Sequence, residues 1–255
     1  MKKFIIVIGV LALLVGGLVL AGGFVMKGKA GNLASAPQVK TGDALAKGAA
    51  IGNAAGLVTL TGAVKCDTPL MSPVAGKPCL FYTHEVKSTW DETSLDTATG
   101  KMKTTSKSET VSSDSDQAAF TIDDGSGAIP VKIKDGSGLD LVSSDPSSVD
   151  AADAPTVKRF GKLKFRANSK IVETERLLVA APTFTVHGKL AAGAIGPDDL
   201  MISLKSRDEM LAATSTMASA LLTIGWVGTI FGVVVILLGM MIKSKSKVLA
   251  VPAPR

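Results

Sequence analysis

The chain has 255 residues, a net charge of +6 and a mean hydropathy of +0.35, which is high for a soluble protein. Of the 28 basic residues, six flank the two most apolar segments, and the rest match the 22 acidic residues in number. A neutral central region argues against a nucleic-acid-binding surface, and this length suits one domain plus anchors. The six flanking residues are Lys2, Lys3, Lys243, Lys245, Lys247 and Arg255.

Two segments without a charge, residues 4–26 and 210–242, lie near the two ends of the chain. A helix needs about 20 apolar residues to cross the roughly 30 Å hydrocarbon core of a bilayer. We predict transmembrane helix 1 over residues 4–26, and a long helix over 206–243 that includes transmembrane helix 2 from about 220 to 242. The length of the first apolar run favours a retained anchor over a cleaved signal peptide.

The charges around the second apolar segment predict the orientation of the chain. Its far side carries Lys243, Lys245 and Lys247 in a basic tail, residues 244–255, whereas basic and acidic residues are mixed before it. Positive charge concentrates on the cytoplasmic side, so we expect both termini in the cytoplasm and the central domain outside it. Ser206 and Glu209 form a capping-box pattern that predicts the start of this helix.

The region between the apolar segments is predicted to be mainly β. Residues 27–56 are rich in Gly, Ala and Ser and predict a juxtamembrane linker with a short helix near 43–50. From 57 to 205, short β-branched runs, one of them at 157–165, alternate with turn residues, which is typical of an antiparallel barrel or sandwich-like domain. Residues 91–117 are almost all polar and predict either a mobile loop or a projecting hairpin.

Both apolar segments carry glycine at seven-residue intervals, and Gly228 and Gly232 of the second segment also form a GxxxG pair. Small residues on one helix face let membrane helices approach closely, although glycine is also common in membrane helices without such a role. We predict that the two helices pack on each other or on other copies of the chain, as in a homo-oligomer. The glycines concerned are Gly9, Gly16, Gly23, Gly225, Gly228, Gly232 and Gly239.

Patterns for catalysis or metal binding are not convincing. The chain has two histidines, His84 and His187, and no HExxH, CxxC, Walker-type or GxSxG motif. We expect two partly exposed strand histidines, no catalytic residue, no metal site and no cofactor. Cys66 and Cys79 either form a disulfide in an oxidising compartment, worth about 3 kcal/mol in the chain-entropy model, or stay as free, buried thiols.

Several short motifs follow one another in a fixed order between the two apolar segments. Residues 69–79 lead into a strand, residues 120–124 precede a glycine turn, residues 173–178 precede a Val-x-Gly, and residues 201–206 run into the second helix. In this order they resemble the GIDE or BAM (beside a membrane) domain, the middle part of the mitochondrial membrane-anchored ubiquitin ligases MULAN or MAPL. The motif positions are Ser72, Pro73, Gly76, Cys79, Phe120, Asp123, Glu173, Glu175, Leu178 and Gly188.

The resemblance implies a membrane-anchored domain on the extracytoplasmic side. In the eukaryotic ligases a zinc-binding RING finger follows the second helix. A RING finger binds two zinc ions through about four Cys or His ligands each, so about eight in total, and this sequence has 2 Cys and 2 His in all. We therefore expect a RING-less member in a bacterial cell membrane, without ubiquitin ligase activity.

The function expected from these features is that of a non-enzymatic membrane scaffold, which binds a protein partner or itself and whose other partner is the lipid bilayer. Two alternatives remain open. One is a membrane-bound hydrolase that uses His84 or His187. The other is an envelope sensor that contacts a ligand through residues 91–117.

Overall fold

The computed structural model describes residues 2–96, 100–143, 147–150 and 169–241. It contains a helical unit, built from the two ends of the chain, and a β-rich unit, Ala36–Arg207. Two long apolar helices flank a β-rich domain, as the sequence predicted. The strand expected over residues 157–165 and the basic tail, residues 244–255, lie outside the described residues.

The helical unit consists of α1, Lys2–Ser35, and α4, Arg207–Met241, both long and apolar enough to cross a membrane. Helix α4 starts directly after Ser206, and the acidic residues of its first turn face the positive end of the helix dipole. Helix α1 continues past Met26 into the segment predicted to be a linker, and Leu33 in this extension is fully buried. It ends just before Pro37, which disfavours helical backbone at the residue before it.

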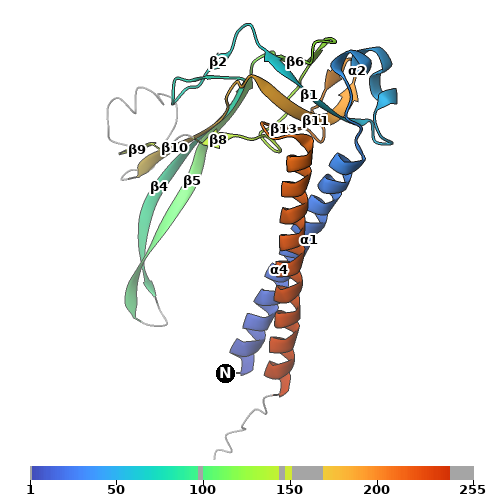
Figure 1. Ribbon diagram of the computed structural model, residues 1–255. Coiled ribbons are helices and arrows are strands. Elements are labelled where there is room, and N and C mark those ends of the chain that lie inside the picture. Colours follow the sequence, from blue (N-terminus) through green and yellow to red (C-terminus); the bar gives the residue numbers. More distant parts are fainter. Residues whose placement is uncertain (1, 97–99, 144–146, 151–168, 242–255) are drawn as a thin grey trace, which may run out of the picture. The chain divides into compact units, whose positions relative to one another are not determined.

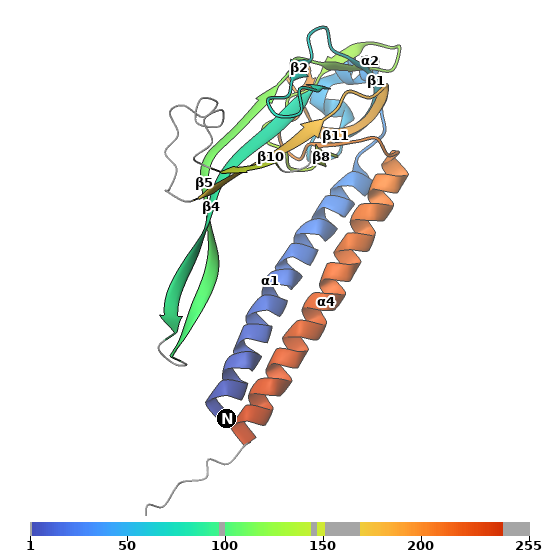
Figure 2. The same cartoon turned by 90° about the vertical axis from the view of Figure 1, so that its left-hand side faces the viewer.

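Helices α1 and α4 run antiparallel and touch through their glycines (Figures 1 and 2). A methyl group added to Gly16 would lie 2.5 Å from the Thr229 nitrogen, and one added to Gly232 would lie 2.6 Å from the Leu13 nitrogen. Such distances leave no room for a side chain between the two backbones. The other five predicted glycines also face the opposite helix, within 3.3 Å of an added methyl: Gly9, Gly23, Gly225, Gly228 and Gly239.

The first sheet of the β unit has six antiparallel strands in the order β12-β11-β1-β6-β7, with β13 beside β11. Strand β1 is buried at four successive positions from Leu57, because residues from both sheets and from α2 cover it. The strands are β1 Leu57–Lys65, β6 Thr121–Asp123, β7 Ala128–Pro130, β11 Thr183–Ala191, β12 Ala194–Ile195 and β13 Met201–Ser203. A short helix, α2 Thr41–Lys47, and a 3-10 turn, Gly48–Ile51, precede them.

The second sheet has five strands in the order β5-β4-β10-β8, with β9 beside β10. Its strands are β4 Phe81–Asp96, β5 Lys101–Gln117, β8 Val142–Ser143, β9 Ser147–Asp150 and β10 Lys170–Leu178. A two-stranded ladder of β2 Leu70–Met71 and β3 Pro78–Cys79 precedes β4.

One hydrophobic core joins the two sheets. Leu80, Phe81 and Leu178 bring the second sheet into the same buried cluster as Leu60 and Phe184 of the first. In the described part of the chain the first sheet is not closed into a barrel. Its end strands, β7 and β12, have three and two residues, and between them the structure has an isolated bridge from Val131, directly after β7, to Ile195 of β12 rather than a continuous ladder.

Strands β4 and β5 form a long hairpin that leaves the other strands of the β unit (Figures 1 and 2). This confirms the hairpin alternative for residues 91–117. The side chains of the far half, beyond Trp90, are almost all exposed. Threonines there supply β-branched side chains that favour strands, and Thr93 and Thr104 are hydrogen-bonded across the pair at 3.1 Å.

The glycine contact can be tested with neighbouring glycines. Gly16→Leu places a side chain against the α4 backbone, whereas Gly17→Leu adds the same side chain where nothing lies within 4 Å of an added methyl. We expect Gly16→Leu to lower the free energy of unfolding by about 1–3 kcal/mol relative to Gly17→Leu. The measurement is unfolding in mixed micelles, followed by Trp226 fluorescence in a Trp90→Phe background. Equal stabilities of the two variants would contradict the contact.

Candidate functional site: a loop held by a buried carboxylate

The loop between β2 and β3 is a tight turn closed by its own residues. The backbone N–H of Ser72 donates to the carbonyl of Lys77 at 2.9 Å, and the N–H of Gly76 donates to the carbonyl of Ser72 at 3.1 Å. The hydroxyl of Ser72 accepts from the N–H of Lys77 at 3.2 Å. Gly76 has a φ of +62°, which glycine adopts without strain. These bonds and the positive φ give a structural reason for a serine at position 72 and a glycine at position 76.

The side chain of Glu175, on β10, binds the backbone of this loop. Its side chain is fully buried, and its two oxygens accept from the backbone N–H groups of Val74 at 3.1 Å and Ala75 at 3.0 Å. Successive N–H groups pointing to one side form a concave binding site for an anion. Here the chain's own carboxylate occupies that site, so a charge-assisted contact fixes the loop to a strand about a hundred residues away.

A second buried glutamate of β10 lies on the same face. Strand side chains alternate between faces, so Glu173 and Glu175 point the same way, and the register pairs Glu175 with His84 of β4. Nε2 of His84 lies 3.2 Å from Oε2 of Glu173, and both side chains are buried. The second sheet therefore carries three ionisable side chains on its covered face.

Cys79 is buried beside this cluster. Burial, and secondly the charge of Glu175, raise the pKa of its thiol, so that the protonated, unreactive form is favoured. Cys66 is half-buried, and the structure holds both cysteines as free thiols. Their pairing in an oxidising compartment stays a prediction.

Both histidines are buried, and the expectation that they are partly exposed is wrong. His187 of β11 is 1% exposed, and its Nδ1 lies 3.1 Å from the hydroxyl of Thr59 on β1, itself fully buried. Burial lowers the pKa of His187. Each histidine finds a polar partner on the neighbouring strand, and this partner is what allows an imidazole to enter the sheet interior.

The hydrogen-bond partners of the two histidines, Glu173 and Thr59, are both buried. The buried Ser88 lies four residues along β4 from His84, or about 13 Å in a strand, too far for a hydrogen bond. Thr59, the partner of His187, has no exposed surface. Within the described ranges, no group of three or more His, Cys, Asp or Glu side chains could hold a metal ion.

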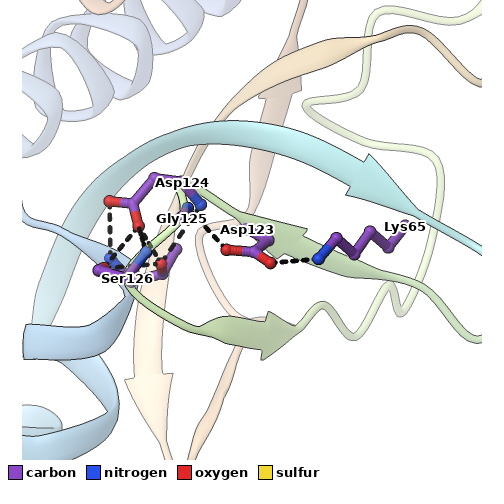
Figure 3. A network of polar contacts seen from close by, with 6 residues as sticks. Lys65, Asp123, Asp124, Gly125 and Ser126 are labelled. Atoms are coloured by element: carbon purple, nitrogen blue, oxygen red, sulfur yellow. Dashed lines mark hydrogen bonds and ion pairs between the residues drawn. The ribbon is translucent and has the colours of Figure 1, made fainter.

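The turn between β6 and β7 binds the start of α2 (Figure 3). The carboxylate of Asp124 accepts from the N–H of Thr41 at 3.1 Å, from the hydroxyl of Thr41, and from the N–H and hydroxyl of Ser126 at 2.9 and 2.6 Å. Lys40 at the helix start gives no side-chain cap, so Asp124 takes that role from a distant turn. The bonds from Ser126 and Thr41 hold the pKa of Asp124 far below its usual range.

Asp123, the motif residue beside it, turns the other way in Figure 3, toward the ammonium group of Lys65. The Lys65 ammonium, and after it the N–H of Gly125 at 2.7 Å, lower the pKa of Asp123. Asp123 therefore forms an ion pair with the neighbouring strand β1, and Asp124 caps helix α2.

The motif positions fall into two groups. Ser72, Gly76, Cys79 and Glu175 lie in or beside the held loop, with Pro73 exposed at its start, and Glu173 pairs with His84 on the same face of β10. The remaining positions serve the core or the turns of the domain: Phe120, Asp123, Leu178 and Gly188.

The clamp by Glu175 and the pair of Glu173 with His84 were not predicted. The signal in the sequence is that β10 places two glutamates in the alternation that also contains the buried Ile171 and Leu177. A charged residue on the core face of a strand requires a polar partner there. The sequence does not name that partner, because the loop and the strand are far apart along the chain.

No protein-family model matches this chain, and comparison with curated proteins and with solved structures finds no match either. The resemblance to the GIDE or BAM domain therefore rests on the motif residues of the sequence alone.

Glu175→Gln tests the carboxylate clamp. The amide keeps one oxygen acceptor and turns an N–H₂ donor toward a backbone N–H, so we expect stability to fall by about 1–3 kcal/mol. Amide hydrogen exchange at Val74 and Ala75 should become faster, measured by mass spectrometry of the peptide that contains them. The matched control is Glu85→Gln on β4, whose partners are the exposed Lys87 and Thr110. Unchanged exchange in Glu175→Gln would contradict the clamp.

The Asp124 cap predicts a pH dependence. A carboxyl group whose pKa is lower in the folded state stabilises the fold above its unfolded pKa of about 3.9, and this contribution is lost as pH falls toward the folded pKa. We therefore expect Asp124→Asn to lower the melting temperature at pH 6, with the difference from wild type shrinking between about pH 5 and pH 2. Asp43→Asn, which removes only an exposed pair with Lys47, serves as the control in the same thermal scans. A difference independent of pH would contradict the cap.

Proposed function

We propose that this protein is a non-enzymatic, membrane-anchored scaffold that presents a GIDE- or BAM-like β domain outside the cytoplasm. The observation that carries the proposal is the pairing of α1 and α4, with glycines on the inside and large apolar side chains on the outside. Leu18 of α1 is 75% exposed, and Ile224 of α4 is 61% exposed. Water would not favour such a surface, whereas lipid tails would cover it.

The length of each helix supports two membrane crossings. A span needs about 20 residues, and α1 and α4 have 34 and 35 residues, so each has turns to spare outside the hydrocarbon core. Because the two helices are antiparallel, one bilayer accommodates both with the chain ends on the same side. The lysines after residue 242 favour the cytoplasm for those ends, in a bacterial cell membrane.

The β unit supports a role in binding rather than catalysis. Its histidines are buried against strand partners, and its cysteine Cys79 is kept protonated. The loop of residues 72–77 is rigidly held with Pro73 and Gly76 exposed, and the β4–β5 hairpin exposes a long polar surface. A fixed loop and a projecting hairpin suit recognition of a protein partner. The 2 Cys and 2 His of the sequence are too few for a RING finger, so ligase activity is not proposed.

Thiol labelling of intact cells tests the topology. Single cysteines are placed at Ser94 in the hairpin and at Ser246 in the tail, in a background with Cys66 and Cys79 replaced. A membrane-impermeant reagent should label position 94 before lysis and position 246 only after it. The protein should also remain in the pellet after extraction with alkaline carbonate.

Two results would overturn the proposal. Release of the protein by alkaline carbonate would show that its helices do not anchor it in the membrane. Labelling of position 246 but not position 94 in intact cells would place the β domain in the cytoplasm. Because both variants share one background, a difference between them cannot come from the cysteine replacements.

A further inference from the structure

Strand β5 presents a long open edge. It has 17 residues and pairs with β4 on one side, and no described strand pairs with its other side. In an antiparallel strand about half of the backbone N–H and C=O groups point to each side. A row of such groups on an edge strand is a template for pairing with another chain. Beyond Trp90 the described residues give the hairpin two strands only, and such a ribbon is marginally stable without a third strand.

The charges along β5 are separated by sign. Its first half contains Lys101, Lys103 and Lys107 and no acid, and its second half contains Glu109, Asp114 and Asp116 and no base. All six lie on one face of the ribbon, because their partners on β4 are all even-numbered. The bulge between Val86 and Lys87 makes this possible, since it leaves Val111 unpaired and brings Asp114 and Asp116 to the face of the lysines.

The described residues do not neutralise the acidic half. The register places Glu109 beside Ser88, Asp114 beside His84 and Asp116 beside Tyr82. Across the described part of the molecule, none of the six charged residues of β5 forms an ion pair. Their side chains are exposed and available to a partner of complementary charge.

We propose that the β5 edge pairs antiparallel with the β5 edge of a second copy of this chain. Antiparallel pairing places the basic half of each strand against the acidic half of the other, whereas parallel pairing would oppose like charges. Two-fold symmetry about an antiparallel pair places one residue opposite itself. With Ser108 on the axis, Lys107 faces Glu109. If Val111 stays bulged, Lys103 faces Asp114 and Lys101 faces Asp116.

This pairing names the partner in the proposed scaffold and rests on that proposal. The two ribbons together form four strands, so each hairpin gains a neighbour that no described strand of its own chain supplies. All three opposed pairs occur twice in the symmetric dimer. Lys103 and Lys101 face Asp114 and Asp116 only in the register that places Ser108 on the axis and leaves Val111 bulged.

Charge exchange tests the proposal on the full-length protein in micelles. The variants carry Ser108→Cys in a Cys66→Ser background, with the buried Cys79 retained. Oxidation should link the two copies through position 108. Lys103→Asp or Asp114→Lys alone creates two repulsive pairs and should lower the linked fraction about tenfold. The double variant restores opposite charges and should recover the linkage. A mixture of the two single variants should link into heterodimers, in which every pair at positions 103 and 114 is attractive.

Ser94→Cys in place of Ser108→Cys is the control, because it is equally exposed in the hairpin and lies on β4, away from the axis. Linkage at position 108 no greater than at position 94 would overturn the pairing, and so would single variants that link as well as the parent. Circular dichroism of each variant excludes unfolding as the cause. If the topology test fails but the linkage at position 108 is intact, the membrane scaffold is refuted and the pairing stands. If the topology test succeeds but the linkage is absent, the scaffold stands and the pairing is refuted.

Discussion

The close contact between α1 and α4 is the constraint on which the rest of the chain depends. Two antiparallel backbones that touch at their glycines require the β unit to begin and end at neighbouring points. Within that unit, Nη2 of Arg207 donates to the carbonyl of Ala36 at 3.2 Å, which joins its first and last residues. The sheet follows the same rule, because β11 lies between β1 and β13, the first and last strands of the domain.

Inside the β unit, two carboxylates bind backbone N–H groups of distant segments. Aromatic residues make up only 4% of the chain, and the core cluster consists mainly of Leu, Ile and Val together with Phe81, Phe120 and Phe184. Glu175 and Asp124 each come from a distant segment and accept backbone N–H groups that have no local acceptor, one in the loop after β2 and one at the start of α2. The same device thus fixes the two elements that cover the sheets.

The sequence predicted those features whose cause is periodic and local. Seven-residue spacing of glycine identified the contact line of the helices, and the capping box identified the start of α4. Long-range polar partners were not predictable, because nothing near Glu175 or His84 in the sequence names Ala75 or Glu173 as its partner. The end of α1 was missed for a different reason: its glycines and lysines are typical of a linker, and burial of Leu33 is decided by packing.

The glycine contacts between α1 and α4 of one chain limit the surfaces through which a second copy could bind. Each predicted glycine already faces the other helix of its own pair, so this close-packing surface is filled before a second copy arrives. The outer helix surface is large and apolar, and lipid competes for it equally well. The self-association that we propose therefore draws on groups that neither lipid nor the described part of the chain satisfies. The open hydrogen-bonding edge of β5 and its six charges without ion pairs in the described structure are such groups, and their order along the strand selects an antiparallel partner.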